Sequence, residues 1–272
     1  MSQHQEIKRL TAIDIRAMKA QEQAFVCLTA YTAPMARVLD EYCDLLLVGD
    51  SVGMVLYGMD STLPVTMDMM IAHTKAVVKA SKKACVIFDM PFGSYQESPE
   101  QAFRNAARAM KETGCQGVKI EGDLEMVETI NFLVQRGIPV MGHIGLQPQS
   151  FNALGGYKVQ GKDKKDAVRI HNNAKMIEEA GVFSMVVEAV PEKLAEKVTK
   201  TVTVPTIGIG ASAQCDGQVL VTEDMLGLSG DSVPKFVRQY ADFKTPLHKA
   251  IKNYADDVRE RSFPSEKHVY SS

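Results

Sequence analysis

The chain has 272 residues, of which 45% are hydrophobic and 24% are charged, and its formal net charge is -2. This is the composition of an ordinary soluble protein with enough apolar residues for a large core. The near-neutral charge argues against nucleic acid or a membrane surface as the main partner, although a small anionic substrate needs only local positive charge.

The first ten residues, MSQHQEIKRL, lack the basic-then-apolar layout of a signal peptide. No apolar run in the sequence approaches the roughly 20 residues that a membrane-spanning helix needs. We therefore expect a cytoplasmic protein. A leading helix is predicted to begin after Thr11, because Asp14 at the third helical position gives an approximate capping box.

Eight short apolar runs follow, and segments with helical periodicity separate them. Such an alternation, with helical segments that end in glycine, is typical of repeated βα units and a parallel sheet. The predicted strands are 25–30, 45–50, 84–90, 117–122, 138–145, 184–190, 204–210 and 218–224.

Eight strands in alternation with helices match a (β/α)₈ TIM barrel in number and length. A doubly wound open sheet is the competing architecture on pattern alone. We expect a single domain over 1–272, with the barrel at about 24–230 and a helical C-terminal tail at about 232–272. Within the tail, 234–243 and 246–262 have helical patterns.

The five cysteines are scattered, without a CxxC pair or a cysteine–histidine cluster. They indicate reduced, mostly buried thiols, and neither a disulfide framework nor a zinc site.

Polar residues end five successive predicted strands, the second to the sixth: Asp50, Asp89, Glu121, His143 and Glu188. In a barrel these strand ends converge on one mouth, where active sites lie. A single acid there is usually a helix cap or solvated, but five in succession favour a shared site. The first three offer hard oxygen ligands, which favour Mg²⁺ or a similar cation. Without a cation, these carboxylates would repel one another and raise each other's pKa.

The predicted strand GVKIEG (117–122) carries two opposite charges. Lys119 and Glu121 are two residues apart and point to one side, while Val118 and Ile120 point to the other. We expect the apolar pair to face the helices and the charged pair to face the barrel axis. The charged pair is then either a structural ion pair, or a metal ligand beside a lysine that meets an anionic substrate group.

Two other patterns suggest different functions. GDSVG (49–53) fits G-x-S-x-G, and Ser51, Asp89 and His143 follow the chain order of an α/β-hydrolase triad. That motif needs a helix directly after the serine, and the glycines and proline within 53–64 predict that none forms. GIGASA imitates a dinucleotide-binding fingerprint, but it follows the seventh predicted strand and not the first.

The connection 147–162 after the fifth predicted strand is too long for a bare barrel loop. Long loops of this kind are usually lids or binding loops, and a disordered insertion is the alternative.

Several long motifs stand in order along the chain: LLLVGDSVGMVLYG (45–58), DSTLPVT (60–66), FDMPFGSY (88–95), VKIEG (118–122), MGHIGLQPQS (141–150), GGYKVQG (155–161), VPTIGIGA (204–211), CDGQVLV (215–221) and DMLGL (224–228). Together they resemble the ketopantoate hydroxymethyltransferase family of pantothenate biosynthesis, from about Thr11 to about Pro264. Departures at Val52, Met59, Gln147, Ser212 and Glu223 concern substrate-loop geometry and none of the expected ligands.

The resemblance implies a Mg²⁺-dependent barrel enzyme. Such an enzyme transfers a hydroxymethyl group from 5,10-methylenetetrahydrofolate to 3-methyl-2-oxobutanoate and forms 2-dehydropantoate through a Mg-stabilised enolate. The resemblance assigns the metal to Asp50, Asp89 and Glu121. It also implies a homo-oligomer, often a decamer.

The same resemblance assigns the remaining roles at the site. The substrate-binding residues would be Asp50, Ser51, Asp89, Lys119 and His143, among which Ser51 and Lys119 would bind the keto acid carboxylate. Glu188 would accept the proton. His143 would orient the new hydroxyl group or assist opening of the folate ring.

Three alternatives stay open on the sequence. A metal-dependent barrel of the phosphoenolpyruvate mutase/isocitrate lyase type shares the acidic ligands, but we do not expect it to combine GGYKVQG with GDSVGMVLYG. A serine hydrolase would use Ser51. A non-catalytic binding barrel would lack at least one of the expected acids, and all four are present.

Overall fold

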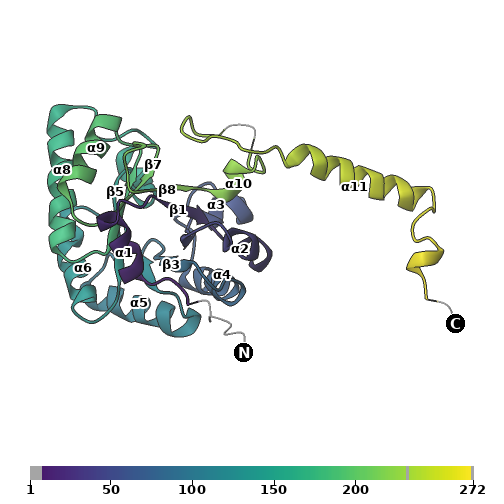
Figure 1. Ribbon diagram of the computed structural model, residues 1–272, viewed down its shortest axis with the longest axis horizontal. Coiled ribbons are helices and arrows are strands. Elements are labelled where there is room, and N and C mark those ends of the chain that lie inside the picture. Colours follow the sequence, from purple (N-terminus) through teal and green to yellow (C-terminus); the bar gives the residue numbers. More distant parts are fainter. Residues whose placement is uncertain (1–7, 231–232, 271–272) are drawn as a thin grey trace. The chain divides into compact units, whose positions relative to one another are not determined.

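The structure is a computed structural model, and it describes residues 8–230 and 233–270 (Figure 1). The chain divides into two compact units, Met1–Val221 and Thr222–Ser272. The expected organisation as a single domain over 1–272 stays a prediction, because compactness alone does not show that either unit folds by itself.

The first unit contains a closed barrel of eight parallel strands in chain order, and the last strand pairs back with the first. This closure confirms the predicted (β/α)₈ barrel and excludes the doubly wound open sheet. The strands are β1 (Phe25–Thr29), β2 (Leu45–Val48), β3 (Cys85–Asp89), β4 (Gly117–Lys119), β5 (Val140–Gly145), β6 (Ser184–Glu188), β7 (Thr206–Ile209) and β8 (Gly217–Leu220).

Helices surround the barrel (Figure 1). Their starts are fixed locally: Thr66 and Ser98, for example, accept a hydrogen bond from the main chain three residues on. No helix among the described residues is long and apolar enough to cross a membrane. The helices of this unit are α1 (Ala12–Ala20), α2 (Ala33–Leu39), α3 (Val52–Tyr57), α4 (Met67–Ala80), α5 (Pro99–Thr113), α6 (Val127–Val134), α7 (Phe151–Leu154), α8 (Lys164–Glu179) and α9 (Glu192–Thr201), with 3₁₀ turns η1 (Leu124–Met126) and η2 (Pro148–Ser150).

Alternation along the strands divides the apolar residues between two cores. Leu46 and Val48 of β2 belong to the larger core, which includes the helices around the barrel, whereas Leu45 and Leu47 belong to the core inside the barrel. The same alternation places Val118 and Ile120 in the outer core, as predicted.

Helix α1 closes the barrel at the end opposite the mouth. The predicted capping box of Thr11 and Asp14 is present at its start. Ile15 is fully buried and belongs to the inner core of the barrel. Lys19 Nζ donates to the carbonyl oxygens of Thr199, in the last turn of α9, and Val204, just before β7, and it pairs at 3.0 Å with Asp216, which precedes β8. The helix therefore plugs the barrel with apolar contacts and is held there by polar ones.

The described cysteines are all free and buried, as the sequence predicted. Burial, together with the charges of two nearby aspartates, raises the pKa of Cys43 to about 11.

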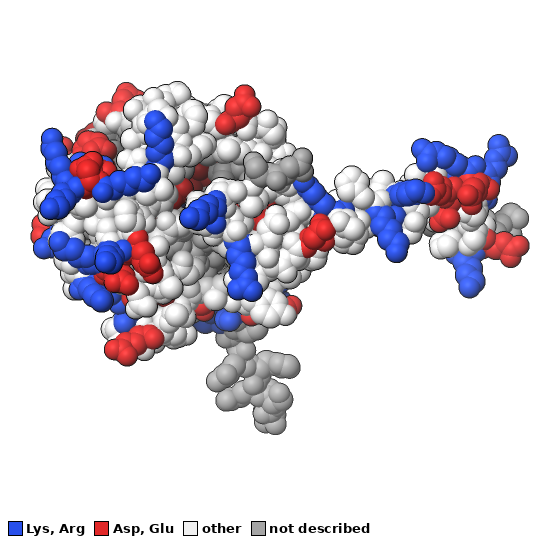
Figure 2. All heavy atoms as spheres, turned by 90° about the horizontal axis from the view of Figure 1, so that it is seen from above, with Lys and Arg blue, Asp and Glu red and all other residues white. Residues whose placement is uncertain are grey.

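The surface of the first unit carries no dominant charge on the face seen in Figure 2, where basic and acidic side chains are interspersed. This distribution agrees with the small net charge of the chain.

The second unit contains α10 (Thr222–Met225), α11 (Lys244–Arg259) and the 3₁₀ turn η3 (Glu266–His268). The predicted strand 218–224 is therefore wrong in its last part, where α10 begins. The predicted helix at 246–262 is confirmed by α11, but the predicted helix at 234–243 is wrong. The main-chain N–H groups of Tyr240 and Phe243 donate to carbonyl oxygens at 225 and 226, and these bonds replace those of a helix.

Helix α11 carries large apolar side chains along one face. They recur at intervals of three or four residues and are exposed to solvent. The residues of this stripe are Phe243, Leu247, Ile251, Tyr254 and Val258.

We predict that Ile15→Ala lowers the free energy of unfolding by about 2 to 5 kcal/mol, because it leaves a cavity in the plugged end of the barrel. Ile13→Ala on the same helix is the matched control, since Ile13 is 79% exposed and Ile15 is 0% exposed. Urea unfolding followed by circular dichroism measures both. Equal effects of the two substitutions would contradict the assignment of α1 as a plug.

Candidate active site

The barrel brings the predicted polar strand ends together at one mouth. Asp89 and Glu188 are the last residues of β3 and β6, His143 lies within β5, and Asp50 and Glu121 follow β2 and β4 by two residues. All of them except the partly exposed Glu188 are buried, and so is Lys119. The convergence that the strand pattern predicted is therefore present.

Lys119 forms its shortest contact with Asp89 and not with its neighbour along the strand. The distance from Lys119 Nζ to Asp89 Oδ1 is 2.6 Å, whereas Glu121 Oε1 lies 3.7 Å away. Asp89 and Lys119 are opposite each other in the β3–β4 register, which explains the closer pairing. Burial lowers the pKa of Lys119, but the surrounding carboxylates outweigh this effect and raise it, so the ammonium stays charged.

Asp50 and Asp89 are adjacent buried carboxylates. The main-chain N–H of Asp50 donates to Asp89 Oδ2 at 3.2 Å. Burial and the charge of Asp89 raise the pKa of Asp50 well above its usual range. The pKa of Asp89 is also raised, because burial and Glu121 outweigh the opposing effect of Lys119. The positive charge of Lys119 therefore does not fully balance the two carboxylates.

The turn after β2 places Ser51 beside these acids. A Cβ atom on Gly49 would lie 2.7 Å from Ser51 Oγ, so this turn requires a glycine. Ser51 Oγ is 2.8 Å from the hydroxyl of Tyr31, which is itself buried. Tyr31 therefore orients the serine that the sequence assigned to carboxylate binding.

His143 lies between two glutamates. Its Nδ1 is 3.3 Å from Glu121 Oε1 and its Nε2 is 3.2 Å from Glu188 Oε2, and both are ion-pair contacts without the alignment of good hydrogen bonds. Burial and Lys119 lower the pKa of His143, but the two glutamates outweigh them and raise it to about 9. Burial raises the pKa of Glu121, and His143, Lys119 and the main chain of Gln149 outweigh burial and lower it.

Gln149 is a residue of the site that the sequence analysis missed. Its side-chain amide donates to Asp50 Oδ2 at 3.0 Å, and its main-chain N–H donates to Glu121 Oε2 at 3.0 Å. Gln149 carries no charge, and it does not stand at the end of a strand but in the loop after β5. The pattern of charged strand ends therefore does not include it. The available signal was its place in the motif MGHIGLQPQS.

The hydrolase arrangement is absent although one argument against it was wrong. A helix, α3, does begin directly after Ser51. Gly53 lets this helix pack closely, since a Cβ there would lie 2.5 Å from Val65, and Gly58 ends the helix in a left-handed conformation at φ +66°. The serine nevertheless contacts Tyr31, and His143 contacts two glutamates, so these residues do not form a triad.

The connection 147–162 extends across the mouth, and the structure describes all of it. Tyr157 reaches Met54 of α3, and the main-chain N–H of Gln160 donates to the carbonyl oxygen of Ala189 after β6. The connection thus spans from one side of the site to the other. Its role as a lid or a binding loop stays a prediction.

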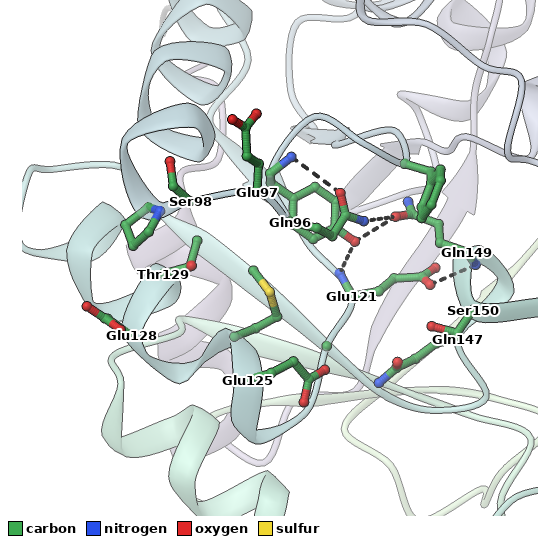
Figure 3. Close-up of a pocket in the computed structure, with 15 residues that line it drawn as sticks. Gln96, Glu97, Ser98, Glu121, Glu125, Glu128, Thr129, Gln147, Gln149 and Ser150 are labelled. Carbon is green, nitrogen blue, oxygen red and sulfur yellow. Dashed lines mark hydrogen bonds between the residues drawn. The ribbon is translucent and has the colours of Figure 1, made fainter. Parts of the chain in front are cut away.

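A cavity of about 280 Å³ adjoins the site (Figure 3). Tyr95, Glu121 and Gln149 form part of its lining and are joined by hydrogen bonds, of which Figure 3 shows the one between Glu121 and Gln149. Glu97, Glu125 and Glu128 also line this cavity. The hydrogen-bonded side of the cavity is therefore shared with the carboxylate cluster.

The acids suit a divalent cation by their chemistry. Asp50, Asp89 and Glu121 offer hard oxygen atoms, and the raised pKa values of both aspartates show that the cluster lacks positive charge. In the part of the chain that the structure describes, no three His, Cys, Asp or Glu side chains are already gathered in a metal-binding arrangement. Lys119 and Gln149 instead hold the two aspartates by hydrogen bonds.

Comparison with known proteins assigns the family. The family model described as ketopantoate hydroxymethyltransferase matches residues 9–266. The chain belongs to this family. It is therefore an enzyme, as the sequence predicted, and the non-catalytic binding barrel is excluded.

Relatives in the family are similar over their whole length. The 3-methyl-2-oxobutanoate hydroxymethyltransferase of Bartonella quintana (strain Toulouse) is 59% identical over 270 residues, which cover 99% of this chain and 98% of that protein. The protein of the same name from Rhodospirillum centenum (strain ATCC 51521 / SW) is 58% identical over 272 residues, covering 100% and 98%.

Solved structures with a similar fold come from a different group of enzymes. A phosphonopyruvate hydrolase matches with a TM-score of 0.62 at 11% identity, over 97% of this chain and 92% of that one. A 2,3-dimethylmalate lyase, described as a member of the PEP mutase/isocitrate lyase superfamily, matches with a TM-score of 0.57 at 15% identity, over 96% and 92%. At these identities the likeness shows the fold alone.

We predict that Asp50→Asn stabilises the protein in EDTA at pH 8, because it removes a buried carboxylate whose charged form is disfavoured. Since the folded-state pKa of Asp50 is raised, the stability that this carboxyl group contributes is complete below its unfolded pKa near 3.8 and is lost as pH rises through the folded value. The gain from asparagine should therefore fade toward pH 4. Urea unfolding at both pH values measures it.

Asp60→Asn is the control for this substitution, because Asp60 is exposed. It should change the free energy of unfolding little at either pH. A loss of stability in Asp50→Asn at pH 8 would show that the cluster does not suffer from excess negative charge.

Proposed function

We propose that this enzyme transfers a hydroxymethyl group from 5,10-methylenetetrahydrofolate to 3-methyl-2-oxobutanoate, giving 2-dehydropantoate for pantothenate and coenzyme A synthesis. The names of its full-length relatives, 3-methyl-2-oxobutanoate hydroxymethyltransferases, support the acceptor and the reaction class. The observation that carries the proposal is the buried set of three carboxylates and one lysine at the barrel mouth, opposite a partly exposed glutamate.

The keto acid carboxylate is bound by Lys119 and by the hydroxyl and main-chain groups of Ser51. Lys119 is the buried cation nearest to Asp89, and it has three donors, of which Asp89 takes one in a hydrogen bond. Ser51 lies on the adjacent turn with its hydroxyl group oriented by Tyr31. These groups fix one end of the substrate so that its reactive carbon faces Glu188.

Glu188 accepts the proton from the branched carbon of the keto acid. It is the least buried acid of the set, and His143 contacts one of its oxygen atoms. A protonated His143 orients Glu188 through this contact, and it can later supply a hydrogen bond to the new hydroxyl group. Water supplies the hydroxyl oxygen, and both C–N bonds of the folate methylene break, which releases tetrahydrofolate. The deprotonated carbon forms the new C–C bond to this one-carbon unit at the formaldehyde oxidation level.

Asp50, Asp89 and Glu121 are the residues that would hold Mg²⁺ or a similar divalent cation. Such an ion acts as a Lewis acid that polarises the ketone and acidifies the neighbouring C–H bond. The negative charge of the three carboxylates is what the ion would balance.

The fold also suits a metal-dependent reaction of the phosphoenolpyruvate mutase/isocitrate lyase type. One structure of that fold is a phosphonopyruvate hydrolase complex with oxalate and Mg²⁺, at 10% identity and a TM-score of 0.60 over 95% of this chain and 93% of that one. The identity of 57 to 59% to hydroxymethyltransferases favours the first proposal.

We also propose that the protein forms a homo-oligomer in the cytoplasm. The resemblance to the family suggests a decamer, and the exposed apolar stripe of α11 offers a surface that association would bury. Light scattering after size exclusion measures the mass, and a monomer of 29.9 kDa would contradict this proposal.

With Mg²⁺, the enzyme should exchange the C3 proton of 3-methyl-2-oxobutanoate with D₂O, which proton NMR follows. Glu188→Gln should slow this exchange by about 10² to 10⁴, because the amide cannot accept the proton. Glu192→Gln is the control, since Glu192 is exposed at the start of α9. If EDTA leaves both exchange and folate-dependent turnover unchanged, the cation has no part in the reaction.

Lys119→Met should raise KM for the keto acid by about tenfold or more, because it removes the charged partner of the substrate carboxylate. Lys162→Met, at an exposed lysine, should leave KM unchanged. Thermal melts identify any loss of folding caused by the uncompensated Asp89. A well-folded Lys119→Met enzyme with the original KM would remove Lys119 from the substrate site.

A further inference from the structure

We propose that Gln149 is a positioning residue that holds Asp50 and Glu121 in the orientation that binds the divalent cation. The inference rests on the proposed function, because it concerns the cation that these two carboxylates would hold. Gln149 lies in η2, in the loop after β5, and it is buried. It follows β5 in the chain, yet it reaches the acids that follow β2 and β4.

The orientation of the Gln149 side chain is fully determined by hydrogen bonds. Its Nε2 donates to Asp50 Oδ2 at 3.0 Å and to the carbonyl oxygen of Met90 at 2.8 Å. Its Oε1 accepts from the hydroxyl of Tyr95 at 2.6 Å and from Gln96 Nε2 at 3.0 Å. A primary amide has two donor hydrogens and two acceptor lone pairs, so every one of them is used.

The reversed amide is excluded by the same contacts. Turning the group over would place Oε1 against Asp50 Oδ2 and the Met90 carbonyl, where three acceptors would face one another. It would also place Nε2 against the Gln96 amide donor. The donor side of Gln149 therefore always faces Asp50.

The main chain of the same residue holds a second carboxylate. The N–H of Gln149 donates to Glu121 Oε2 at 3.0 Å, and Tyr95 Oη accepts from the N–H of Glu121 at 3.1 Å. Gln149 and Tyr95 thus connect the segments that follow β3, β4 and β5. The spacing between the acids depends on this connection as well as on the barrel.

Holding Asp50 by Oδ2 leaves its Oδ1 available as a ligand, whereas the other oxygen of Glu121, Oε1, also lies 3.3 Å from His143 Nδ1. Gln149 takes Oδ2 of Asp50 and Oε2 of Glu121, which removes rotational freedom that cation binding would otherwise have to remove. A neutral amide does this without changing the charge of the cluster. A lysine here would compete with the cation, and a glutamate would add to the repulsion.

The test is the affinity of the protein for Mn²⁺, measured by electron paramagnetic resonance of the free ion. Gln149→Met keeps the length of the side chain and removes all four hydrogen bonds, and it should weaken Mn²⁺ binding by about 10- to 100-fold. Gln147→Met is the matched control: Gln147 is buried in the same loop, and its side chain faces Asp123 at 3.4 Å. That variant should bind Mn²⁺ as the wild type does.

A second variant removes a single hydroxyl group, so that the inference can still be tested if Gln149→Met does not fold. Tyr95→Phe deletes the hydroxyl that orients the Gln149 amide and does not touch Asp50, so it should weaken Mn²⁺ binding in the same direction by about threefold to tenfold. A positioning role also predicts a split in kinetics. The Mg²⁺ concentration for half-maximal C3 proton exchange should rise in both variants, while the rate at saturating Mg²⁺ stays within about threefold of wild type.

Asp50→Asn separates failure of this inference from failure of the proposed function. In one outcome, the wild type binds Mn²⁺, Asp50→Asn abolishes this binding, and Gln149→Met and Tyr95→Phe bind as the wild type does. Gln149 then has no positioning role, but the cation site is supported. An equal loss in Gln147→Met would also overturn the inference, since it would show a general effect of the loop. If the wild type binds no Mn²⁺ that depends on Asp50, the proposed cation site is wrong and the inference falls with it.

Discussion

The structure depends on how negative charge is accommodated inside a barrel. Three carboxylates, Asp50, Asp89 and Glu121, lie in a buried mouth with a single lysine among them. Charges in such a place interact strongly, because little water screens them. Lys119 bonds to Asp89, His143 lowers the pKa of Glu121, and Asp50 is left with a pKa well above its usual range. Positive charge is thus distributed unevenly among the three carboxylates. This explains why the site suits a cation and why its acids need polar neighbours.

Strand alternation connects this site to the stability of the fold. In β4 and the two residues after it, Val118 and Ile120 pack in the outer core with the helices, whereas Lys119 and Glu121 belong to the site. One segment of main chain therefore places core residues on one side and site residues on the other. The plug formed by α1 contributes from the other end, because it closes the inner core without using any residue of the mouth.

Much of this arrangement could be predicted from the sequence, and the reasons are physical. Eight apolar runs and the acids at their ends are local patterns, and a closed barrel brings such ends together without further information. What could not be predicted depends on contacts distant in sequence. The partner of Lys119 is set by the β3–β4 register, and the role of Gln149 depends on neighbours from three segments. The helix after Ser51 and the absence of one at 234–243 are also decided by packing and by distant main-chain bonds.

The position of α1 has a consequence for synthesis of the chain. Lys19 donates to the carbonyl oxygen of Thr199, 180 residues later, and pairs with Asp216. While the ribosome is still adding the first half of the barrel, these partners do not exist, and Ile15 has only part of its surroundings. The helix that is synthesised first thus gains its tertiary contacts late. The apolar face of α1 stays exposed in the nascent chain until residue 216 has emerged from the ribosome.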